Sequence, residues 1–118
     1  MYKAPVDDIA FALKKVAGLE AAMEQGLLGE LTPDLLDAVL EEAGRFAGEE
    51  IAPLADVGDR EGTSVKDGVV TTPTGWKALY ESWSAGGWNA LTGPEEYGGQ
   101  GLPTSLSAAV FEMWNSAS

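Results

Sequence analysis

The sequence contains no cysteine and no histidine among its 118 residues. Without cysteine, the chain has no disulfide, no zinc–thiolate site and no thiol nucleophile. Without histidine, it lacks the most frequent general base, metal ligand and triad partner. Carboxylates, lysines and tyrosines remain as possible acids and bases. The composition therefore disfavours an autonomous hydrolase, and we assign no residue a catalytic, cofactor-binding or metal-binding role.

Basic residues are also scarce, with 7 Lys and Arg against 19 Asp and Glu and a formal net charge of −12. Phosphate backbones and anionic membranes repel such a chain, so we expect neither nucleic acid nor a membrane surface as a partner. An acidic surface is common for solubility alone, and it identifies no other partner. No apolar run approaches the ~20 residues of a membrane span. No signal-like segment opens the chain, so we expect a cytoplasmic protein.

Helical periodicity dominates the chain and predicts an all-α fold, an orthogonal or up-down bundle of about four helices. The first helix follows Pro5, with Asp7 or Asp8 as its N-cap. Gly18 weakens this helix, and a glycine-rich turn ends it before residue 30. Its apolar residues recur at helical spacing and are Ile9, Leu13, Val16 and Leu19.

The second helix has the strongest signals, because Thr32 is a good N-cap and Pro33 fits the first helical position. We expect it to end at Pro53. Its continuous apolar stripe comprises Leu36, Val39, Leu40, Ala43, Phe46, Ala47 and Ile51. The stripe predicts that this helix forms one wall of the core.

The next stretch, residues 54–73, is expected to be irregular, with turns at 58–62 and 66–68 and a short extended piece at 69–72. A third helix then begins at a Thr74 N-cap and ends at Gly86 and Gly87. Its apolar residues recur at helical spacing and are Trp76, Leu79, Tyr80 and Trp83; of these, Trp76 and Trp83 are expected in the core. A glycine-rich loop spans residues 93–103.

A fourth helix begins at Thr104 or Ser105, and Leu106, Val110, Met113 and Trp114 form its apolar face. This helix still runs at Ser118 without a glycine, a proline or a cap, which predicts that the domain is truncated there. Trp114 fits two alternatives equally well, a core position or an interface with sequence beyond the chain.

The acidic residues of the second helix do not predict a metal site. A carboxylate-bridged di-iron bundle typically supplies His from Glu-x-x-His pairs, and this sequence has none. Glu41, Arg45 and Glu49 lie four residues apart, which is typical of ion pairs on an exposed helix face.

The loop Tyr97–Gly101, "YGGQG", matches neither of the two well-known phosphate-binding patterns. It has no Lys-Ser/Thr pair after its last glycine, and it lacks the spacing and the preceding strand of a dinucleotide fingerprint. We interpret it as a sharp reversal between two helices that requires positive φ angles.

Four segments occurring in order give the sequence a family resemblance: residues 41–54 (EEAGRFAGEEIAPL), 58–62 (GDREG), 87–103 (GWNALTGPEEYGGQGLP) and 112–118 (EMWNSAS). Together they resemble the N-terminal domain of acyl-CoA dehydrogenases. The opening residues 2–13 resemble the extension of larger bacterial members, including the 3-methylmercaptopropionyl-CoA dehydrogenase branch. The resemblance implies two segments, an extension with a short helix at 1–30 and an incomplete N-terminal helical domain at 31–118.

The resemblance also implies a function for the longer enzyme. Family members use FAD to convert an acyl-CoA thioester to the 2-enoyl-CoA, usually pass the electrons to an electron-transfer flavoprotein, and are often homo-oligomers. Their flavin-binding barrel and catalytic carboxylate lie outside the segment that this sequence resembles. We therefore expect this chain alone to be inactive and to wall the acyl pocket, with Met113 and Trp114 as candidates for support near the substrate.

A free-standing acidic helical module that binds another protein is the alternative function. A coding sequence that continues into a β-rich domain would favour the enzyme, whereas a natural stop after Ser118 would favour the module.

Overall fold

A computed structural model describes residues 1–118 and confirms the all-α class. Six α-helices account for most of the chain: α1 (Val6–Phe11), α2 (Leu19–Glu24), α3 (Pro33–Phe46), α4 (Ala52–Glu61), α5 (Trp76–Ala85) and α6 (Thr104–Ala117). Two π turns, η1 (Ala12–Val16) and η2 (Ala47–Ile51), continue helices, and two 3₁₀ turns, η3 (Trp88–Ala90) and η4 (Glu95–Tyr97), lie between α5 and α6.

The N-terminal end of α3 forms as predicted. Thr32 is extended, and its Oγ1 accepts a hydrogen bond from the backbone N–H of Leu35 at 3.1 Å. Pro33 then occupies the first turn, where its missing N–H costs no hydrogen bond. Leu36 and Leu40, from the predicted stripe, are completely buried.

The prediction that this helix ends at Pro53 is wrong. The backbone continues from α3 through η2 into α4, which ends only at Glu61, so the predicted turn at 58–62 is mostly helical. In η2 the N–H of Ala52 bonds to the carbonyl of Ala47, five residues back. Pro53 then lies in the first turn of α4, where the missing proline N–H is tolerated.

The two other predicted caps are also wrong. Pro5 precedes α1 directly, and neither Asp7 nor Asp8 forms a side-chain cap. Gly75, with φ +85°, precedes α5, and its left-handed backbone takes the place of a Thr74 cap. Val16, expected on the apolar face of the first helix, is exposed because η1 and Gly18 change the helical register before α2.

A two-stranded hairpin lies where only one extended piece was expected. β1 (Ser64–Lys66) pairs antiparallel with β2 (Val69–Thr71) across a two-residue loop. Asp67 and Gly68 both have positive φ, 52° and 77°, which is typical of the tight turns that join hairpin strands. The turn at 66–68 is confirmed, and every hairpin residue is exposed.

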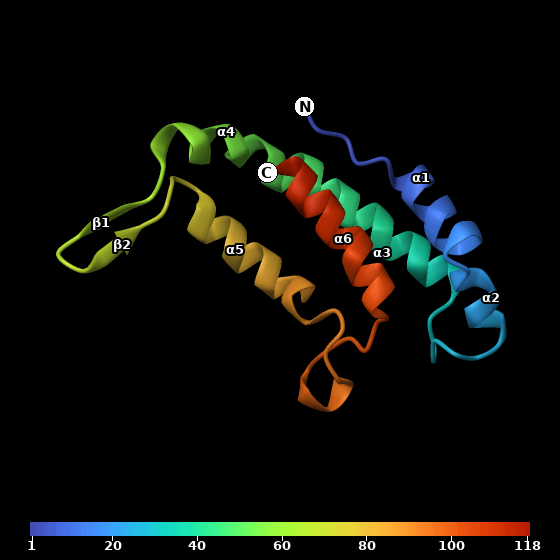
Figure 1. Ribbon diagram of the computed structural model, residues 1–118. Coiled ribbons are helices and arrows are strands. Elements are labelled where there is room, and N and C mark those ends of the chain that lie inside the picture. The colour runs from blue at the N-terminus through green and yellow to red at the C-terminus, as the bar shows by residue number, and fades with distance from the viewer.

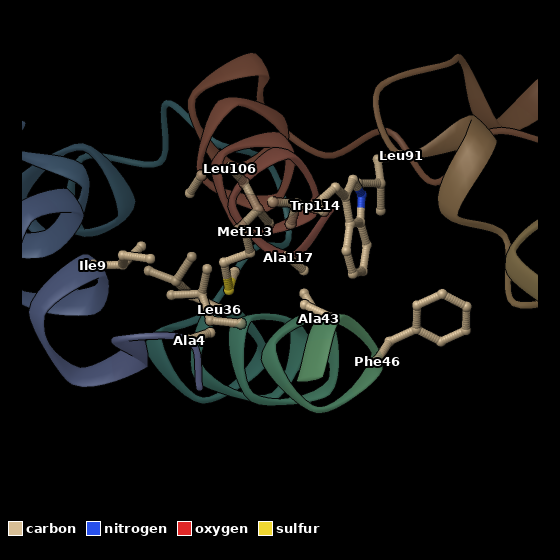
Figure 2. Packing of buried hydrophobic residues seen from close by; sticks show 14 of the residues in the cluster. Ala4, Ile9, Leu36, Ala43, Phe46, Leu91, Leu106, Met113, Trp114 and Ala117 are labelled. Atoms are coloured by element: carbon tan, nitrogen blue, oxygen red, sulfur yellow. The ribbon is translucent and has the colours of Figure 1, made fainter. Parts of the chain in front are cut away.

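The core lies between α3 and α6, and α1 also packs against α3 (Figure 1). Figure 2 shows apolar side chains from α3 and α6 meeting in this core. Leu106, Val110, Met113 and Trp114 of α6 are all buried, as their spacing predicted. In contrast, α4 and α5 contain no buried residue.

The molecule is open and elongated. Its radius of gyration is 16.4 Å, against about 13.5 Å for a compact domain of this length. It exposes 7462 Å², about 1,400 Å² more than a typical monomer of its mass. The excess exceeds the ~800 Å² that one partner contributes to a standard interface. None of the helices combines the length and apolarity needed to cross a bilayer.

Candidate functional site: an aromatic groove beside α5

Two carboxylates, Glu42 of α3 and Glu49 of η2, pair with Arg45. Arg45 donates to Glu42 at 2.6 Å and to Glu49 at 2.9 Å, so Glu42 is the first partner and not the expected Glu41. The hydrogen bond from Arg45 lowers the pKa of the Glu42 carboxyl. No group of three or more carboxylates is placed to hold a metal ion. These residues form an exposed ion-pair network.

The most distinctive concavity is an apolar groove of about 430 Å³ between α5, α6 and the α3–η2 segment. We call it the aromatic groove. Half of its lining residues are aromatic residues on α5 and α6, and no charged residue lines it. Its lining residues are Phe46, Ile51, Trp76, Leu79, Tyr80, Trp83, Phe111, Trp114, Asn115 and Ser118.

Trp114 forms the inner wall of the aromatic groove. Its ring meets Phe46 edge-on, with centroids 5.5 Å apart and planes at 74°, and meets Trp88 at 5.3 Å and 83°. Such edge-to-face pairs are favoured by the quadrupoles of the rings. The outer wall is less enclosed, since Tyr80 is 62% exposed and Phe111 51%. The groove therefore combines a well-packed inner wall with an exposed outer wall.

The two residues predicted near a substrate point in different directions. Figure 2 shows Met113 directed toward Leu36 and Ala4, whereas Trp114 is directed toward Leu91. Met113 is completely buried in the α3–α6 core and does not line the aromatic groove. Trp114 is buried and lines it, so the structure gives Trp114 both a core position and a groove position.

The chemistry of the aromatic groove is limited to apolar contact. Its polar lining residues are Asn115 and Ser118, and the Asn115 amide already donates to the Phe111 carbonyl at 2.8 Å. The groups whose pKa departs from its ordinary value, Lys15, Glu42, Arg45 and Glu61, all lie elsewhere. The groove suits an apolar ligand or protein surface, and no Asp, Glu, Lys or Arg side chain lines it.

The glycine-rich loop is closed on itself. The N–H groups of Gln100 and Leu102 donate to the carbonyls of Ala90 and Leu91 at 2.9 and 2.8 Å, and Gly101 donates to Gly93 at 2.9 Å. Gly98 and Gly101 have φ of +86° and +62°, which confirms the predicted reversal. These amides are used internally, so the loop presents no nest for a phosphate.

A larger hollow of about 680 Å³ lies between residues 27–35 and this loop, but its chemistry is less specific. Its two charged lining residues, Glu30 and Glu95, are both acidic, and no positive side chain lines it. An anion would be repelled there. We therefore place the candidate site at the aromatic groove.

Sequence reasoning did not identify the aromatic groove. Trp76 and Trp83 were expected in the core, yet neither is fully buried, and Tyr80 on the same helix is largely exposed. The signal available was Phe111, which lies three residues before Trp114 and so continues an aromatic face of α6 toward α5.

Comparisons with known proteins agree with the sequence resemblance. The family model described as acyl-CoA dehydrogenase, N-terminal domain, matches residues 33–118. The 3-methylmercaptopropionyl-CoA dehydrogenase of Ruegeria pomeroyi is 42% identical over 116 residues. The match covers 98% of this chain but 20% of the relative. This chain thus spans about one fifth of the length of the curated relative it matches.

Proposed function

The chain belongs to the acyl-CoA dehydrogenase family, and we propose that it is the N-terminal part of a FAD-dependent acyl-CoA dehydrogenase. The observation that carries the proposal is the 42% identity to a dehydrogenase over almost the whole chain. The reaction is the α,β-dehydrogenation of an acyl-CoA thioester to the 2-enoyl-CoA. The relative's name makes 3-methylmercaptopropionyl-CoA the first substrate to test. The alternative, a free-standing interaction module, is not favoured by these matches.

Within this enzyme, the chain has a structural role. The remaining domains cover the aromatic groove and the surface beside it, because α5 and α6 leave apolar area exposed there. Trp114 supports the acyl pocket from the groove side, and Met113 supports it from behind through the α3–α6 core. The segments at 1–30 and 31–118 act as an extension and a helical domain, with the extension packed on α3 through Ala4 and Val6.

The residues of this chain do not fit the diphosphate of FAD. Three of its seven basic side chains, Lys3, Lys66 and Lys77, are outside ion pairs, and they lie in three different parts of the fold. Diphosphate recognition requires converging donors or positive charges. We therefore assign FAD binding to the rest of the enzyme. We place the catalytic base, the oligomer contacts and the contact with an electron-transfer flavoprotein there as well, and we propose that the enzyme is cytoplasmic.

A chimera tests this proposal. The matched N-terminal stretch of the Ruegeria enzyme is replaced by this chain, and flavin absorbance and acyl-CoA-dependent dye reduction are recorded. We expect a yellow, active chimera. The intact Ruegeria enzyme is the positive control, and the 118-residue chain alone should be colourless and inert. A folded chimera without flavin or turnover, beside an active parent, would contradict the proposal.

A further inference from the structure

Helix α5 is attached to the rest of the molecule mainly at its two ends. At its start, the indole N–H of Trp76 donates to the Leu54 carbonyl at 3.1 Å, and the ring lies directly on Gly58. A Cβ at Gly58 would collide with this ring. Between its ends, Leu79 and Trp83 line the aromatic groove and are only partly buried where they pack against the edge of the core. No side chain of α5 is fully buried, so the position of the helix depends largely on the attachments at its two ends.

The second attachment involves Gln100 of the glycine-rich loop. Its side-chain Nε2 donates to the carbonyl of Gly87, immediately after α5, at 2.9 Å. Gly87 has φ +80°, and a Cβ there would lie 2.6 Å from Nε2 of Gln100. A glycine is thus required at this position both for the backbone angle and for the approach of the Gln100 amide.

The backbone of the loop holds Gln100 in place. Gly99 lies so close to Gly93 that a Cβ on it would overlap the Gly93 carbonyl, and the Gln100 N–H itself bonds to Ala90. The close backbone packing of the loop therefore fixes the Gln100 side-chain amide beside the end of α5. This geometry accounts for the "GGQG" motif, which has no ligand-binding role in the described site.

The Gln100 contact is adjacent to the inner wall of the aromatic groove. Trp88 follows Gly87 directly, and its ring meets Trp114 at 5.3 Å. A displacement of Gly87 would therefore move both the end of α5 and the Trp88–Trp114 pair. We infer that Gln100 is a positioning residue, which acts through the Gly87 carbonyl to set the distance between α5 and α6 and hence the width of the aromatic groove. The importance of that width for the enzyme rests on the proposed function.

The test compares side chains of similar length with and without a donor. Gln100→Met and Gln100→Glu remove the hydrogen bond to Gly87 at neutral pH, whereas Gln100→Lys retains a donor of sufficient reach. Near-ultraviolet circular dichroism of the 118-residue chain reports the coupled Trp88 and Trp114 rings, and the far-ultraviolet signal reports helix content. Gln25→Met, on the exposed residue that follows α2, is the matched control.

We expect Gln100→Met and Gln100→Glu to lose the tryptophan-pair signal with unchanged helix content, and Gln100→Lys and Gln25→Met to retain it. Retention of the signal by Gln100→Met would overturn the inference. If Gln100→Met also loses helix content, Gln100→Lys decides, because a donor-specific role requires that this variant keep both signals. These spectra need no flavin or substrate, so a failure here is distinguishable from a failure of the chimera.

In the active chimera, Gln100→Met should raise the KM for the acyl-CoA severalfold and leave kcat nearly unchanged, since the groove residues touch no reacting atom. A loss confined to kcat would contradict a role in groove width.

Discussion

The α3–α6 contact and the attachment of α5 hold the same chain together in different ways. Between α3 and α6, side chains such as Leu40 and Met113 are completely buried and interdigitate. Helix α5 has no fully buried residue. Leu79 and Trp83 pack against the core only partly buried, and hydrogen bonds from Trp76 and Gln100 attach the two ends of the helix. Figure 1 shows this difference, with α6 lying along α3 and α5 set apart. The first region is a closed core, and the second is a helix with an uncovered apolar face.

The largest expected effect separates the two regions by truncating one leucine in each. Leu40→Ala should destabilise the chain by about 2–5 kcal/mol, because a fully buried side chain leaves a cavity. Leu79→Ala should cost about 1 kcal/mol, since Leu79 borders the open groove and is only partly buried against the core. Urea unfolding of both variants measures the free energies. Equal costs would show that α5 is part of the core and would remove the distinction.

Gly58→Ala should detach the start of α5 without unfolding the core. The new methyl would collide with the Trp76 ring. Overpacking of this kind costs about 1–3 kcal/mol, offset by up to ~1 kcal/mol of improved helix propensity in α4. Trp76 should become more exposed, so we expect a red-shifted tryptophan emission and faster proteolysis between α4 and α5. In a Trp76→Leu background the ring is absent, so Gly58→Ala should add no further destabilisation to that of Trp76→Leu alone; an added cost there would contradict the steric cause.

A smaller effect is expected at the first turn of α3. Thr32→Ala removes the hydrogen bond to the Leu35 N–H and should cost about 1 kcal/mol, whereas Thr32→Ser should keep most of the stability. Thr104→Ala is the matched control at the start of α6, because that helix follows Pro103 without a side-chain cap and Thr104 is exposed. We expect the control to change the free energy of unfolding by less than ~0.5 kcal/mol. A cost at Thr104 equal to that at Thr32 would contradict the assigned cap.

The core was predictable from sequence because its signals are local. The Thr32–Pro33 start and the apolar stripe place α3 correctly, and the face containing Leu106 and Val110 places α6. Pro53 misled the prediction, since the π turn η2 lets the helix continue where regular α-helical bonding would not. Whether a proline ends a helix depends on the hydrogen-bond register of the preceding turn, which no residue pattern specified here.

The aromatic groove could not be predicted in the same way. The spacing of Trp76 and Trp83 correctly gives one helix face, but it does not say whether another element covers that face. The position of that face relative to α6 depends on the Gln100 and Trp76 attachments of α5, which connect residues 13 and 22 positions apart. The hairpin was missed for a related reason, because a two-residue Asp67–Gly68 loop flanked by three-residue strands is too short to show alternation.

The smallest expected effect concerns the base of the hairpin, where α4 and α5 are connected. Glu61 Oε2 accepts a hydrogen bond from the backbone N–H of Thr74 at 2.8 Å. Hydrogen bonding from Thr74 lowers the pKa of the Glu61 carboxyl below its ordinary value. A carboxyl whose pKa falls on folding stabilises the native state above its unfolded pKa, and this contribution is lost as the pH falls through the folded pKa.

Acidification should therefore release the Glu61–Thr74 contact before the α3–α6 core unfolds. The Thr74 amide resonance, followed from pH 7 downward, should shift upfield as Glu61 is protonated, while the amide of Leu35 at the Thr32 cap stays unchanged. The Glu61→Gln variant has no carboxyl to titrate at this position, so it should lose the pH-dependent step at Thr74. A step that survives the substitution would assign the titration to another group. If Thr74 and the core amides change together, the hairpin base is part of the core, and α5 is held more firmly than its two end attachments indicate.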